Sequence, residues 1–250
     1  MLKLISRCIM KNLLLNKIRL TQYFVLLFGI YIIVVVLLPD TKFSTGALTL
    51  FSVNSFLYGF YIAPILNAQK MRIEELHRIV RAEANAVFAM VLSVKKLQKQ
   101  LRNQLQAMFL AYLEAVLRQK HSSGGEEEYE RLITFCLDYK GPHDDEIAEL
   151  LNKVVLNQQN RTNFAMQMSN KVYSNEWMIM TVLFSVTLTF ILLLSAGDTY
   201  LYQLLAALLS TGLTMLLVIL VKMSTLTHKK ARQMWDPYKK LIKSHFYRID

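Results

Sequence analysis

The segment Leu20–Leu38 reads LTQYFVLLFGIYIIVVVLL and contains no Asp, Glu, Lys, Arg or His. Three further stretches share this uncharged, apolar character, and they run over Ser44–Leu66, Trp177–Ala196 and Thr199–Val221. A helix needs about 20 apolar residues to cross the hydrocarbon core of a bilayer, and each stretch is close to that length. The sequence therefore predicts an all-α membrane protein with four transmembrane helices, which form two hairpins.

These spans divide the chain into regions. We expect a basic amphipathic helix over 1–19, a transmembrane hairpin over 20–66, a helical cytosolic domain over 67–176, a second hairpin over 177–221 and a basic cytosolic tail over 222–250. Past the second span, apolar residues recur at steps of three and four, which is typical of an amphipathic helix. The second span is therefore predicted to continue as a long helix, with a break near Lys95–Gln100. A later helix is predicted from Asp145 to about Tyr173, leading into the third span.

The formal net charge of +11 is concentrated at the two ends of the chain. Lys and Arg beside membrane spans mark the cytoplasmic side. We therefore expect a multi-pass protein of the cell (inner) membrane, with both termini and the central domain in the cytoplasm. Attraction to anionic lipid headgroups accounts for the remaining basic character, so no nucleic-acid partner is expected.

The chain carries no pattern that is typical of an enzyme. It has no glycine-rich phosphate loop, no nucleophile elbow and no histidines at metal-binding spacing. The acidic cluster His143–Glu146 is interpreted as a helix start with a negatively charged first turn, and Glu126–Glu128 as a solvated loop. We expect no catalytic residue, no metal site and no cofactor.

The second span is unusual because polar residues occur along its length. At 100° per residue, one face carries the candidate pore-lining residues Ser52, Phe56, Gly59, Phe60, Ala63 and Asn67, and it continues through the candidate vestibule residues Lys70, Glu74 and Arg81. Polar groups at membrane depth tend to face protein or water. Rings of Phe can form a hydrophobic constriction, but small residues and Phe also suit a packed helix bundle. A second face, with Asn54, Tyr58 and Tyr61, is an alternative lumen.

Two local segments resemble a known family. Arg78–Ala86 (RIVRAEANA) resembles the acidic-Ala-Asn segment of the bacterial bestrophin-like family of unknown function, which is distantly related to bestrophin anion channels. Arg161 and the run to Trp177 resemble that family's Arg…Trp entry segment. The order of spans agrees over about Ser44–Tyr238. The resemblance implies a homopentamer with the second span around a central pathway, and a neck at Ser52, Phe56 and Phe60. The bestrophin calcium clasp is not recognisable.

Two functions remain open from the sequence. One is an oligomeric channel that passes anions through a pore built from several copies of the second span, with membrane lipids, permeant ions and further copies of the chain as partners. The other is a non-conducting membrane scaffold or sensor that presents cytosolic helices to a partner. Glu83, Asn85 and Arg161 are predicted to form a structural or gating polar group, in which Glu83 pairs with Arg161 or with Arg78.

Overall fold

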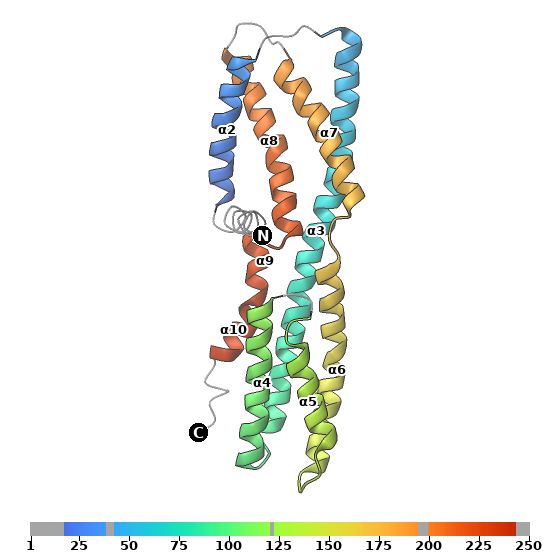
Figure 1. The fold of residues 1–250 in the computed structure, drawn as a ribbon, viewed down its shortest axis with the longest axis vertical. Coiled ribbons are helices and arrows are strands. Elements are labelled where there is room, and N and C mark those ends of the chain that lie inside the picture. Colours follow the sequence, from blue (N-terminus) through green and yellow to red (C-terminus); the bar gives the residue numbers. More distant parts are fainter. Residues whose placement is uncertain (1–17, 39–42, 121–122, 195–199, 244–250) are drawn as a thin grey trace, which may run out of the picture. The chain divides into compact units, whose positions relative to one another are not determined.

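The computed structural model describes residues 18–38, 43–120, 123–194 and 200–243, and the regular elements in these ranges are helices (Figure 1). The predicted amphipathic helix over 1–19 lies almost wholly outside the described residues. The chain divides into two compact units, of which the first comprises 1–71 and 171–228 and the second comprises 72–170 and 229–250. Helix α3 contributes residues to both units, because it runs without interruption over Thr45–Val94.

The first unit contains the apolar helices. They are α2 (Leu20–Leu37), the first part of α3, α7 (Ser174–Leu193) and α8 (Tyr200–Ser224). By length and composition, four of the described helices can cross a membrane. This agrees with the prediction of an all-α membrane protein. The third span begins three residues earlier than predicted, and the fourth extends to Ser224 rather than Val221.

Apolar side chains from α3, α7, α8 and the segment just before α7 form the core of the first unit. Its buried members are Tyr58, Ile62, Val172, Met180 and Leu220. Helix α2 lies along α8 (Figure 1) and has no buried residue of its own. The hydroxyls of Tyr31 on α2 and Thr214 on α8 share a hydrogen bond of 2.7 Å. The large apolar surface that remains exposed on α2 suits a lipid environment.

The second unit is a bundle of amphipathic helices. It combines the last part of α3 with α4 (Lys99–Gln119), α5 (Glu126–Asp138), α6 (Asp144–Ser169), α9 (Lys229–Arg232), the 3₁₀ turn η1 (Gln233–Trp235) and α10 (Asp236–Lys243). Helix α3 ends at Val94, and the chain turns before α4 starts at Lys99. The sequence predicted a break at this point. Buried residues of the bundle include Leu76, Val87, Phe109, Leu132 and Leu150.

Two predicted elements need correction. The helix that was expected to run from Asp145 to about Tyr173 ends at Ser169, and α7 starts separately at Ser174. The backbone N–H of Tyr173 donates to the Glu176 carboxylate at 2.9 Å, which caps the new helix instead of prolonging the old one. The segment 222–250 was expected to be a tail. Instead α8 continues into it, and Trp235 and Tyr238 are buried in the second unit.

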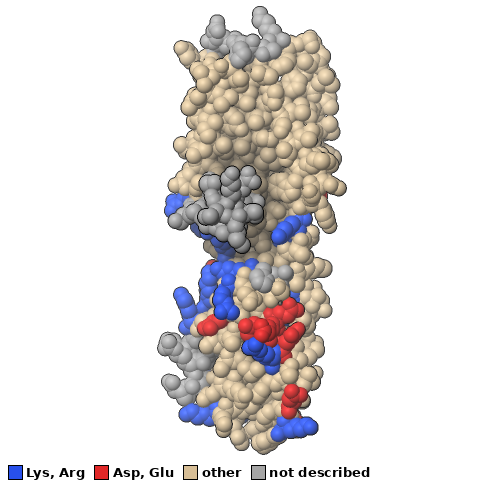
Figure 2. Space-filling model, viewed as in Figure 1, with Lys and Arg blue, Asp and Glu red and all other residues tan. Residues whose placement is uncertain are grey.

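The two units differ in surface chemistry. On the face seen in Figure 2, Lys, Arg, Asp and Glu gather on the second unit, while the surface of the apolar helices is almost free of charge. Exposed large hydrophobic residues on α2, α7 and α8 include Ile33, Val36, Val182 and Leu201. Apolar surface of this extent faces lipid or another protein.

Candidate functional site

One face of α3 is uncovered along the apolar part of the helix. We call it the free face, and it comprises Ser52, Phe56, Gly59, Phe60, Ala63 and Asn67, all of which are exposed. Phe56 and Phe60 are 68% and 69% exposed. Their rings stack on one another with centroids 6.0 Å apart. A side chain added at Gly59 would meet nothing within 4 Å. The free face therefore presents two aromatic rings and small or polar side chains to whatever surrounds the first unit.

The opposite face of α3 is packed inside the first unit. The Asn54 amide Nδ2 donates to the Leu183 carbonyl at 3.1 Å and to the Thr187 hydroxyl at 2.7 Å, both on α7. Tyr58 is 2% exposed, and Tyr61 packs against the core. This was the alternative lumen face. Its side chains pack within the first unit, so the free face is the side of α3 that can contact other molecules.

Charged residues continue the stripe of the free face into the second unit. Lys70, Glu74 and Arg81 are all exposed. Arg72 lies just off this stripe and is buried instead. Its guanidinium donates from Nε to the Gln167 carbonyl at 2.7 Å and from Nη2 to the Met168 carbonyl at 2.8 Å. Arg72 thus holds the C-terminal end of α6, a role that hydropathy and spacing did not reveal.

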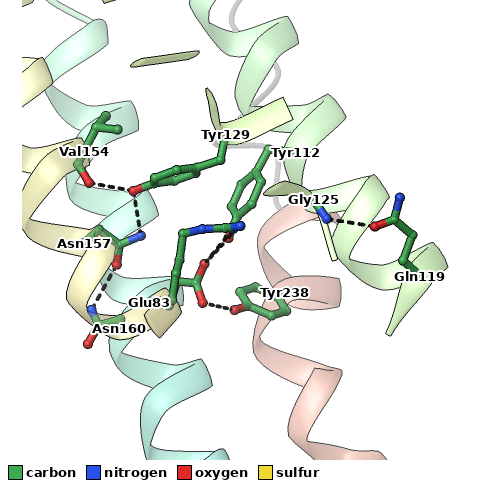
Figure 3. A network of polar contacts seen from close by, with 10 residues as sticks. Glu83, Tyr112, Gln119, Gly125, Tyr129, Val154, Asn157, Asn160 and Tyr238 are labelled. Carbon is green, nitrogen blue, oxygen red and sulfur yellow. Dashed lines mark hydrogen bonds and ion pairs between the residues drawn. The ribbon is translucent and has the colours of Figure 1, made fainter. Parts of the chain in front are cut away.

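Glu83 is a carboxylate buried in the core of the second unit (Figure 3). The Tyr238 hydroxyl on α10 donates to its Oε2 at 2.6 Å. The Tyr112 hydroxyl on α4 donates to its Oε1. Hydrogen bonds to an ionised acceptor are stronger than neutral ones. Glu83 therefore joins α3 to α4, the next helix in the chain, and to α10 near its C-terminal end.

Arg161 on α6 completes this network without a close ion pair. Its Nη1 donates to the Tyr112 hydroxyl at 2.7 Å and lies 4.0 Å from Glu83 Oε1. The guanidinium carbon stands 4.4 Å from the ring centroid of Tyr129 and 5.0 Å from that of Tyr112, which is cation–π geometry. Tyr129 is held by its own bonds, to the Val154 carbonyl at 2.7 Å and from the Asn157 amide at 3.1 Å.

Burial keeps the tyrosines of the network protonated. It raises the pKa of Tyr112 and of Tyr238 well above the ordinary value, and the negative charge of Glu83 adds to this effect. Burial also raises the pKa of Tyr129 to about 12. Burial lowers the pKa of Arg161, but neighbouring Tyr112 and Glu83 raise it by more. The hydroxyls therefore remain donors and the guanidinium remains charged, which suits a structural connection or a ligand contact rather than proton transfer.

The structure brings together only part of the predicted polar group. Glu83 and Arg161 share the network, whereas Asn85 is exposed and lies outside it, because it falls on the opposite side of α3. Arg78, the alternative partner of Glu83, pairs with Glu75 at 2.6 Å. The tyrosines were not predicted as site residues. Tyr112 lies in the apolar stripe of its helix, and no local pattern marks Tyr238. Within the described ranges, no three His, Cys, Asp or Glu side chains are grouped to hold a metal.

Comparison with known proteins places the chain in a family. A model of the Bestrophin-like domain matches residues 22–238. A search of curated proteins and a search of solved structures each found no match. The matched range begins in α2 and ends in α10, so it includes the free face of α3 and the whole Glu83 network. The family points to a channel-type function in general. The chain belongs to the bestrophin-like family.

Proposed function

We propose that the protein is a homo-oligomeric ion channel, in which the free faces of several α3 helices surround the permeation pathway. The observation that carries this proposal is the exposure of Phe56 and Phe60 on a helix whose opposite face packs in the core of the first unit and bonds to α7 through Asn54. Family membership supports the same function class. By the family resemblance the oligomer is a pentamer.

The free face has the chemistry of a gated pore. Ser52, Phe56 and Phe60 follow one another at intervals of four residues, or about 6 Å of helix. In a ring of copies they form successive layers, and the two Phe layers make a hydrophobic constriction that can stop ions by dewetting. Polar Ser52 and Asn67 on the same face favour water or protein over lipid.

One copy cannot enclose a pathway with this face alone, because the surface of a single helix is convex. Closed cyclic symmetry brings the same face of every copy to one axis. The outer helices α2 and α8 then retain lipid contact, which agrees with their exposed aliphatic side chains.

Charge at the end of the free face favours anions. Lys70 and Arg81 accompany a single acidic residue, Glu74, on the exposed stripe. Basic side chains that line a confined mouth raise the local concentration of anions. We place this mouth, together with both termini, on the cytoplasmic side of the cell membrane, because Lys and Arg are concentrated at the two ends of the chain and mark the cytoplasmic side.

Reconstitution of the purified protein into planar bilayers tests this proposal. We expect chloride currents whose reversal potential follows the chloride gradient. Phe56→Ala and Phe60→Ala should increase the current by widening the constriction. Phe24→Ala, a partly exposed aromatic position on α2, is the matched control and should leave the current unchanged. An intact oligomer that stays silent at every voltage, calcium concentration and pH would contradict the proposal.

A non-conducting scaffold is the second candidate. Exposed apolar side chains on the second unit favour it, since Leu137, Val155 and Leu156 are 62%, 54% and 75% exposed. Apolar residues on a bundle outside the membrane suit contact with a protein partner. A scaffold should show no current in planar bilayers. A structure of its intact oligomer should show no open pathway between the α3 helices.

A further inference from the structure

A polar pocket in the second unit lies beside Arg161. Its volume is about 200 Å³, and it is lined by Ser123, Glu126, Gln158, Arg161, Thr162 and Ala165. All of these residues belong to the second unit. The pocket is smaller than the roughly 300–1,000 Å³ that is usual for drug-sized ligands, so it suits a small molecule.

Arg161 is the buried group that points to a ligand. Its side chain is 10% exposed, yet only Nη1 has a hydrogen-bond partner among the described residues. A guanidinium carries five N–H donors, so the donors on Nε and Nη2 remain available. The nearest carboxylate, Glu83, is 4.0 Å away and already accepts two tyrosine hydroxyls. Within the described part of the chain, the buried polar atoms that lack a partner include none from Arg161, so these two donors are accessible from the pocket that Arg161 lines.

An anionic group in the pocket would accept hydrogen bonds from these two donors. The planar fork of an arginine matches a carboxylate through two parallel hydrogen bonds. The hydroxyl of Thr162 and the amide of Gln158 line the same pocket and offer further polar contacts. Glu126 lines the same pocket and carries the opposite charge to Arg161, so it repels a phosphate or any other polyanion and attracts an ammonium group.

We propose that this pocket binds a small zwitterion of the amino-acid class, with its carboxylate on Arg161 and its ammonium group on Glu126. This site shares no residue with the proposed pore, so the absence of current in bilayers would not disprove it. It is nevertheless connected to α3, because the Arg161 guanidinium bonds to Tyr112 and Tyr112 bonds to Glu83.

Binding is measured on the full-length protein in detergent, by titration calorimetry and by thermal unfolding. The probes are glycine, L-alanine and L-serine, with acetate and methylamine as the two halves of the zwitterion and inorganic phosphate as the competing anion. A ligand that binds only the folded state raises the unfolding temperature with concentration. We expect the amino acids to raise it at concentrations where acetate, methylamine and phosphate do not.

Variants of Glu126, the acidic residue that lines the pocket, distinguish zwitterion binding at this site from general carboxylate binding. Glu126→Gln should weaken glycine binding at least tenfold and should leave acetate binding no weaker than in the wild type. Glu130→Gln is the matched control, because Glu130 is exposed on the same helix and does not line the pocket. Arg161→Lys should abolish binding of all the amino acids, and circular dichroism establishes that this variant is folded.

Three results would overturn the assignment. The first is no heat and no thermal shift with any amino acid probe. The second is equal binding of glycine and acetate by the wild type, which removes the role of Glu126. The third is stronger binding of phosphate than of glycine, which replaces a zwitterion with an anion.

Discussion

At the scale of single residues, the buried carboxylate of Glu83 accepts hydrogen bonds from two tyrosine hydroxyls, which offset the cost of removing its charge from water. Tyr238→Phe removes one donor and leaves a carboxylate oxygen buried and unpaired. Losing such a bond costs about 1–3 kcal/mol. Tyr112→Phe should cost more, because Tyr112 also accepts the bond from Arg161. We expect unfolding temperatures in detergent to fall in that order.

Tyr173→Phe is the control for these two variants. Tyr173 is 71% exposed, and surface substitutions usually change stability by about 0.5 kcal/mol or less. Equal unfolding temperatures for Tyr173→Phe and Tyr238→Phe would show that the bond to Glu83 contributes nothing to stability.

The buried tyrosines also predict an alkaline limit to stability. The folded state raises the pKa of Tyr129 from 10.0 to about 12, and it raises those of Tyr112 and Tyr238 as well. The folded protein therefore holds these protons more tightly than the unfolded chain. The protonated tyrosines contribute their full share to the free energy of unfolding below about pH 10, and this contribution declines as the pH rises through about 12.

A pH titration of the detergent-solubilised protein checks this limit. Tyrosinate absorbance should rise in two stages, and the later stage should coincide with the loss of helical circular dichroism. Tyr129→Phe should flatten the decline in stability above pH 10 relative to the wild type. A single tyrosinate transition with the helical signal intact would contradict the prediction.

At the scale of elements, Arg72 on α3 holds the last turn of α6 through two carbonyl groups. A cation at the C-terminus of a helix also interacts favourably with the helix dipole. Arg72→Ala should therefore unravel this turn. We expect faster hydrogen–deuterium exchange in peptides over 164–170, with exchange near the start of α6 unchanged.

Arg78→Ala is the matched control for Arg72→Ala. Arg78 occupies the same helix but is exposed and bonds only to Glu75 within the described part of the chain. Its loss should leave exchange in α6 as in the wild type. If both variants exchange alike, the connection between Arg72 and α6 is not a stabilising one.

At the scale of the whole molecule, the proposed oligomer places Phe60 of each copy near the same residue of its neighbours. In a background with Cys8 and Cys136 replaced by Ser, Phe60→Cys should form disulfide-linked dimers upon mild oxidation in membranes. Val36→Cys is the control, because Val36 is 59% exposed on α2, which we place toward lipid. Cross-linking at position 36 and none at position 60 would put α2 at the axis.

The spans and the stripe of the free face could be predicted because hydropathy and helical period are local properties. A run of uncharged apolar residues has one stable arrangement in a bilayer, whatever the rest of the chain does. The same local information predicted the end of α3 near Lys95. It failed at the junction of α6 and α7, where a backbone N–H bonded to Glu176 starts a new helix.

The partners of Glu83 and Arg161 could not be predicted in this way. Tyr112 and Tyr238 lie 29 and 155 positions from Glu83 in the sequence, and only packing of the second unit brings them together. Packing also distinguished the two polar faces of α3, since α7 covers Asn54 and leaves Phe56 exposed. Composition and period therefore establish which segments are helical and apolar, but contacts between distant segments establish which side chains remain available for function.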